Sequence, residues 1–176
     1  DIHTQIQNIL QEKVGDVALK LHTARSRNDQ VVFATKFYCK DQLREAKTNI
    51  DEFILKMNEL ISENSDVIIP GFTHMQHAQP VYLKDYFQAY IEMLKRDRDR
   101  LGYIDEHLRI TFGAGALAGT PILAEKYLNS PVPPLETGGI KGGFSVGPTV
   151  NSLDAVSDRD FVIEIISALA IVAMHL

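Results

Sequence analysis

The feature that most restricts the fold of this chain is a stretch, residues 26–69, that contains no proline and no glycine. Those two residue types are the ones that most often interrupt a helix. In the second half of the stretch, apolar residues recur at steps of three and four, namely Ile50, Phe53, Ile54, Met57, Leu60 and Ile61. We therefore predict one helix from residue 26 to about 63, roughly 55 Å long at the usual rise per residue. Such a length is typical of a bundle of long helices.

The remaining segments extend the helical pattern. Residues 1–14 place Ile2, Ile6 and Ile9 on one face, which predicts a short amphipathic helix that Gly15 ends. A polar loop is expected from there to about residue 25. After a break at 64–80, a second long helix is predicted over about 81–111, with Pro80 suited to its first turn.

Residues 112–150 hold most of the chain's glycines and prolines, which predicts a long irregular connection. Helix is expected again from about Ser152 to the end of the chain. No segment alternates strongly between apolar and polar residues as a strand does, so the predicted class is all-α. The last residues, "FVIEIISALAIVAMHL", carry Glu164 and are short for a membrane span, which favours a buried bundle helix.

Composition narrows the function classes. A net charge of −5 over 176 residues argues against a nucleic-acid-binding protein. The single cysteine, Cys39, has no partner for an internal disulfide, which fits a reducing, cytoplasmic setting. His74 and His77 have no third ligand at a zinc-like interval, so no metal is expected. Both ends of the chain look cut from a longer protein.

The segment "LHTARSRNDQV" at 21–31 lies where the first long helix begins. Ser26 and Asp29 have the spacing of a capping box, a hydroxyl followed three residues later by a carboxylate. The same helix start offers unpaired N–H groups and a positive dipole end, and Arg27 could clamp a carboxylate. The residues alone leave open whether this is a plain helix cap or an anion site.

Three other polar segments leave similar choices. The loop "THMQHAQP" at 73–80 is either a hydrogen-bonded structural loop or a source of proton transfer through histidine. The segment "NSLDAVSDRDF" at 151–161 fits a helix cap with ion pairs. The run "KRDRDR" at 95–100 is expected to be a solvated, ion-paired helix face.

Together these segments resemble the argininosuccinate lyase family of the aspartase/fumarase superfamily. The resemblance rests on "DIHT", "LHTARSRNDQ", "PGFTHMQHAQP", "GAGALAGT" and "NSLDAVSDRDF", which occur in this order over nearly the whole chain. It implies a central bundle of long helices and a homotetramer whose active sites combine segments of three subunits. Residues 26–176 would belong to the bundle domain and residues 1–25 to an N-terminal part.

The resemblance also implies the chemistry, the reversible elimination of L-arginine from argininosuccinate to give fumarate, without a cofactor or metal. Ser26, Asn28 and Thr73 would hold the succinate-derived carboxylates, and Arg27 would help to clamp the substrate. His74 matches the active-site histidine that assists proton transfer, and His3 matches a further histidine near the site.

This sequence departs from the family pattern at Ala24, where the family usually has glycine, and after Pro121, where the connection is longer. The serine-bearing loop that carries the presumed base is expected downstream of residue 176, so the chain by itself should be inactive. The alternatives are an inactive structural protein of the delta-crystallin type and a sibling lyase acting on adenylosuccinate, malate or aspartate.

Overall fold

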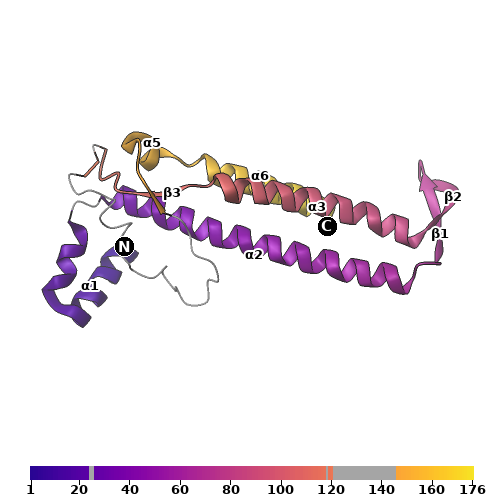
Figure 1. Cartoon of the computed structure of the whole chain (residues 1–176), viewed down its shortest axis with the longest axis horizontal. Coiled ribbons are helices and arrows are strands. Elements are labelled where there is room, and N and C mark those ends of the chain that lie inside the picture. Colours follow the sequence, from indigo (N-terminus) through magenta and orange to yellow (C-terminus); the bar gives the residue numbers. More distant parts are fainter. Residues whose placement is uncertain (24–25, 118, 121–145) are drawn as a thin grey trace. The chain divides into compact units, whose positions relative to one another are not determined.

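The computed structural model describes residues 1–23, 26–117, 119–120 and 146–176 (Figure 1). The chain divides into two compact units. Unit 1 contains residues 1–38 and 109–158, and unit 2 contains residues 39–108 and 159–176. Helix α2, Arg27–Glu63, contributes its first turns to unit 1 and the rest to unit 2. Its bounds confirm the predicted long helix within one residue.

Unit 1 begins with helix α1, Ile2–Val14. The Asp1 carboxylate caps it by accepting a hydrogen bond from the Thr4 N–H at 3.0 Å, and Gly15 ends it with a φ of 71°. A 3₁₀ helix, η1 (Gly15–His22), follows. The prediction of a polar loop here was wrong, because this segment carries apolar residues of which Ala18 is buried.

The rest of unit 1 comes from residues 109–158. Strand β3, Ile110–Phe112, pairs in parallel with β4, Val146–Pro148. A short helix, α5 (Ser152–Ser157), follows. The expected irregular connection therefore begins and ends with short strands, and its residues 121–145 lie outside the described part of the chain.

Unit 2 packs three helices around one core: the second part of α2, α3 (Leu83–His107) and α6 (Asp160–His175). Figure 1 shows α6 running beside α3, and the two helices are in contact. The core side chains come from all three helices and include Leu43, Ile50, Met57, Ile91, Leu94, Leu101, Ile104, Phe161, Ala168 and Val172. The all-α class is confirmed in the sense that the chain is mostly helical.

The prediction of one helix from Ser152 to the chain end was wrong in one respect. Asp158 and Arg159 interrupt it, and Asp158 has an extended ψ of 122°. The interruption separates α5 from α6. Among the described helices, none is long and apolar enough to cross a membrane.

Between α2 and α3 the chain forms a β-hairpin that the sequence analysis did not predict. Strand β1, Ile68–Thr73, pairs in antiparallel fashion with β2, Gln76–Tyr82. Pro70 lies opposite Pro80, and the register shifts at Gly71. A Cβ at that glycine would lie 2.5 Å from the Gln79 carbonyl oxygen, so the irregularity needs a residue without a side chain.

Candidate active site

The first turn of α2 confirms that Ser26 caps the helix, although the bond goes to the residue two positions on and not to Asp29 as a capping box predicts. Ser26 Oγ accepts a hydrogen bond from the Asn28 N–H at 3.2 Å, which satisfies one of the unpaired donors at the helix start. Arg27 and Asn28 are exposed, whereas Ser26 is half-buried. This helix start therefore presents a hydroxyl, a guanidinium and an amide to its surroundings at the positive end of the helix dipole.

The Asp29 carboxylate of the predicted box contacts a distant segment. Asp29 is 4% exposed, and its Oδ2 accepts a hydrogen bond from the Gly115 N–H at 3.3 Å. Gly115 belongs to the glycine-rich turn that follows β3, and its φ of +59° is in the left-handed region. Asp29 thus connects the start of α2 with a turn 86 residues later in the sequence.

Two contacts bring the beginning of α1 to the same helix start. Arg27 Nη1 lies 2.6 Å from Oδ2 and 2.7 Å from Oδ1 of Asp1. The His3 Nδ1 lies within hydrogen-bond distance of the Gln30 Nε2, at 2.9 Å. Unit 1 therefore gathers four of the predicted site residues, Ser26, Arg27, Asn28 and His3, at one end of α2.

The remaining predicted site residues, Thr73 and His74, belong to unit 2, at the tip of the hairpin. Thr73 pairs with Gln76, so that His74 and Met75 form a two-residue turn. Their φ angles are 50° and 62°, the combination that a type I′ turn requires. Two residues with side chains are unusual in that conformation, and such strained positions concentrate at functional sites. Thr73 and His74 are both exposed, and Met75 is 98% exposed.

The segment at 151–161 behaves as the capping and ion-pair interpretation predicts. Asn151 Oδ1 accepts hydrogen bonds from the N–H groups of Leu153 and Asp154 at 3.0 and 3.2 Å. Asp158 forms an ion pair with Lys36 of α2 at 2.5 Å, and the Lys36 side chain is 8% exposed. The Asp158 side chain is 30% exposed, and the pair holds the end of α5 against the first turns of α2. No local pattern in the sequence indicates that these two residues meet.

The run at 95–100 is ion-paired as predicted, but the expectation that all of it is solvated was wrong. Asp97 is fully buried, and it accepts from Arg100 Nη1 at 2.6 Å and lies 2.7 Å from His175 Nδ1. Because His175 lies near the end of α6, this contact fixes α6 on α3. A charge pattern alone does not show which of two alternating aspartates faces the core.

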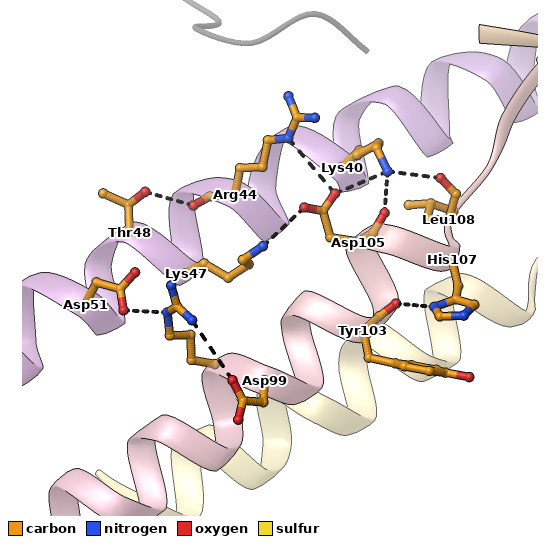
Figure 2. Close-up of polar contacts among 11 residues, drawn as sticks. Lys40, Arg44, Lys47, Thr48, Asp51, Asp99, Tyr103, Asp105, His107 and Leu108 are labelled. Atoms are coloured by element: carbon orange, nitrogen blue, oxygen red, sulfur yellow. Dashed lines mark hydrogen bonds and ion pairs between the residues drawn. The ribbon is translucent and has the colours of Figure 1, made fainter. Parts of the chain in front are cut away.

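Three basic side chains of α2 surround another buried carboxylate, that of Asp105 on α3 (Figure 2). Lys40 and Lys47 approach its two oxygens at 3.2 and 3.3 Å, and Arg44 approaches at 4.0 Å. The Lys40 ammonium also donates to the carbonyl oxygens of Asp105 and Leu108, the latter at 3.1 Å. These contacts cap the C-terminus of α3, where a cation is favoured and a lone carboxylate is not.

The described residues contain no group of three or more histidine, cysteine, aspartate or glutamate side chains arranged to hold a metal ion. The residues predicted to bind substrate or transfer protons therefore lie at two places. One is the start of α2 in unit 1 and the other is the hairpin tip in unit 2.

Comparison with known proteins decides the family. A family profile described as "Lyase" matches residues 1–176, the whole chain. The chain belongs to this lyase family, within the aspartase/fumarase superfamily. The resemblance that the sequence motifs indicated is therefore confirmed.

Curated members of the lyase family give a finer comparison. The argininosuccinate lyases of Lachnospira eligens and Caldanaerobacter subterraneus subsp. tengcongensis are 42% and 40% identical to this chain over its full length. The chain spans 36% and 38% of these two relatives, a little more than a third of their length.

Two solved structures confirm the fold. EDDS lyase in complex with formate matches 97% of this chain with a TM-score of 0.78 and 25% identity, over 32% of its own chain. The β-carboxy-cis,cis-muconate cycloisomerase of Acinetobacter calcoaceticus matches 98% of this chain and 38% of its own, with a TM-score of 0.69 and 22% identity.

Proposed function

We propose that the protein containing this chain is an argininosuccinate lyase, which eliminates L-arginine from argininosuccinate and releases fumarate. The observation that carries the proposal is the identity of 40–42% with argininosuccinate lyases over all of this chain. The geometry at the start of α2 supports it, since exposed donors at a helix N-terminus suit a substrate with several carboxylates.

The proposed reaction removes a proton from the carbon beside a carboxylate and breaks the bond between the neighbouring carbon and the arginine nitrogen. The electron pair of the broken C–H bond forms the fumarate double bond, and arginine leaves with the other pair. Charge accumulates on the carboxylate next to the deprotonated carbon, so fixed donors around it lower the barrier. In this scheme Ser26, Asn28 and Thr73 supply such donors.

Arg27 and the two histidines have the other proposed roles. Arg27 clamps the substrate. To do so, its guanidinium releases the Asp1 carboxylate and binds a carboxylate of the substrate instead. His74 assists proton transfer from its exposed place in the turn, and His3 contributes near the start of α2. The base is expected on the serine-bearing segment that the family resemblance places beyond residue 176.

We further propose a cytoplasmic homotetramer that needs no cofactor. The apolar surface of α6 supports association, since Ile163 and Ile166 are 68% and 62% exposed. Arginine biosynthesis and the urea cycle use the same chemistry, so either pathway fits the proposal.

The test uses the full-length protein with argininosuccinate, and follows fumarate by its ultraviolet absorbance. Turnover is expected. In His74→Asn the rate should fall by at least about 100-fold, the lower range for loss of acid–base assistance. Asparagine tolerates the left-handed conformation, so the hairpin and the tetramer should persist in this variant. A near-wild-type rate would remove His74 from the mechanism.

The same assay separates the alternatives. A folded tetramer without turnover on any fumarate-releasing substrate would favour a structural protein of the delta-crystallin type. Turnover with adenylosuccinate, malate or aspartate, but not with argininosuccinate, would assign a sibling activity.

A further inference from the structure

The turn that follows β3 is held at two places in unit 1. Phe112, the last residue of β3, packs edge-on against Phe33 of α2 with ring centroids 5.6 Å apart. Three residues further on, the Gly115 N–H donates to Asp29 at 3.3 Å. Within the turn, the Gly119 N–H donates to the Ala114 carbonyl oxygen at 2.9 Å. This part of the chain therefore has a defined position against the start of α2.

The turn cannot readily take another shape. Gly115 has a φ of +59°, and a Cβ there would lie 2.6 Å from the Gly119 carbonyl oxygen. Ala114 is fully buried. Ala114 and Gly115 are therefore closely packed, and among the described contacts the Asp29 side chain binds the backbone of the turn at Gly115.

The Asp29 side chain is a carboxyl group in a place that is unfavourable for a charge. Asp29 is 4% exposed, and burial of a carboxylate is costly unless donors and a positive potential compensate for it. The helix N-terminus supplies the potential and the Gly115 N–H supplies a donor. A simple helix cap would need neither the burial nor the contact with a distant turn.

Asp29 also belongs to the same helical turn as the groups that we have placed around the substrate carboxylates. Ser26 Oγ binds the Asn28 N–H, and Asn28 directly precedes Asp29. A shift of Asp29 relative to the turn after β3 would therefore carry the Ser26 hydroxyl and the Asn28 amide with it.

We propose that Asp29 is a positioning residue for substrate binding: by holding Gly115 it fixes the turn after β3 against the first turn of α2 and thereby places Ser26 and Asn28. This inference rests on the proposed function, because the substrate's carboxylates are the groups that Ser26 and Asn28 bind.

The experiment measures kcat and KM for argininosuccinate in the full-length protein and in four variants. In Asp29→Ala the KM should rise about tenfold or more, as expected for the loss of a hydrogen bond to a charged group, and kcat should change less than KM. Asp29→Asn keeps an oxygen that can accept from Gly115, so its KM should stay within about threefold of the wild type. Gly115→Ala, with Asp29 intact, should raise KM as Asp29→Ala does.

Val32→Ala is the matched control. Val32 is 5% exposed and lies three residues beyond Asp29 in α2, so its truncation lowers stability at the same place while the contact between Asp29 and Gly115 is kept. Its KM should equal that of the wild type. Hydrogen exchange adds a readout that does not depend on activity, since the Gly115 amide should exchange faster in Asp29→Ala and not in Val32→Ala.

The outcomes are distinguishable. An active wild type with an unchanged KM in Asp29→Ala, or with an equal rise in KM in Val32→Ala, overturns the positioning role and leaves the proposed function standing. A folded wild type that does not turn over argininosuccinate overturns the proposed function and this inference with it. Exchange at Gly115 would then report a purely structural contact.

Discussion

Two glycines of unit 2 should respond in opposite ways to the same substitution. In Gly71→Ala, the new Cβ would start 2.5 Å from the Gln79 carbonyl oxygen and would have to reach at least 3.4 Å for ordinary contact. The atom in the way belongs to the backbone of the paired strand, so the two strands must separate. In Gly102→Ala, the nearest atom is the flexible Lys47 ammonium at 3.9 Å, and the helix accepts a methyl group without movement.

The expected free-energy changes of the two substitutions follow from these geometries. Overpacking of this kind costs about 1–3 kcal/mol. The hairpin is mostly exposed and contacts the helical core little, so the cost should appear as local opening and not as global unfolding. The opening constant of the hairpin should therefore rise about 5- to 150-fold. Gly102→Ala should stabilise α3 by about 0.5–1 kcal/mol, because glycine is less favourable than alanine within a helix.

The assay is hydrogen exchange followed by mass spectrometry on the full-length protein. Peptides that cover residues 67–83 should lose protection in Gly71→Ala, whereas peptides from the middle of α2 and α3 should not. Turnover should fall in the same variant because the hairpin carries Thr73 and His74. Equal protection of the hairpin in Gly71→Ala and the wild type, or uniform loss of protection throughout unit 2, would refute the reasoning.

Three further variants or reactions test individual contacts. His175→Ala should lower the free energy of unfolding by about 3 kcal/mol in denaturant titration. The reason is that the fully buried Asp97 loses its contact with His175 and keeps the one with Arg100. A loss below about 0.5 kcal/mol would mean that the contact between Asp97 and His175 does not hold α6. Ser26→Ala should lower the free energy of unfolding by about 1 kcal/mol, because a helix cap is lost, and it should also raise the KM for argininosuccinate. An unchanged KM would limit the role of Ser26 to capping. Burial raises the pKa of the Cys39 thiol, so less thiolate is present at a given pH. A disulfide reagent at pH 8 should therefore react with Cys39 more slowly than with free cysteine. Equal rates would show that the thiol is open to solvent.

The long helices could be predicted because their signal is repeated over many residues. The absence of helix-breaking residues and the recurring apolar positions place α2 within one residue. The second long helix was predicted within a few residues of α3 at each end. The capping role of Ser26 could be predicted for a similar reason, since it depends on neighbours in the sequence.

The hairpin could not be predicted from the same patterns. Its strands do not alternate in polarity, and proline at 70 and 80 argues against a strand. Its turn is formed by His74 and Met75, whereas the type I′ turn is usually recognised by Asn-Gly or Asp-Gly. The strands β3 and β4 have three residues each and lie far apart in the sequence, so neither carries a pattern of its own.

The pairs that organise the candidate site were missed because they join distant segments. Asp29 with Gly115 and Lys36 with Asp158 are contacts of the folded chain, and no local spacing indicates them. The site residues themselves came from resemblance to a family, and their roles stay predictions until the variants are measured.

The opposed prolines of the hairpin have a consequence for how the protein behaves at high concentration. Two residues without N–H groups can face each other only at a non-hydrogen-bonded position, where the missing donors would have pointed outward. Each outer edge of this exposed, partly apolar ribbon therefore lacks a donor at Pro70 or Pro80. A strand from another molecule cannot continue the ladder past that point, so the hairpin can present Thr73 and His74 in the open without becoming a template for aggregation.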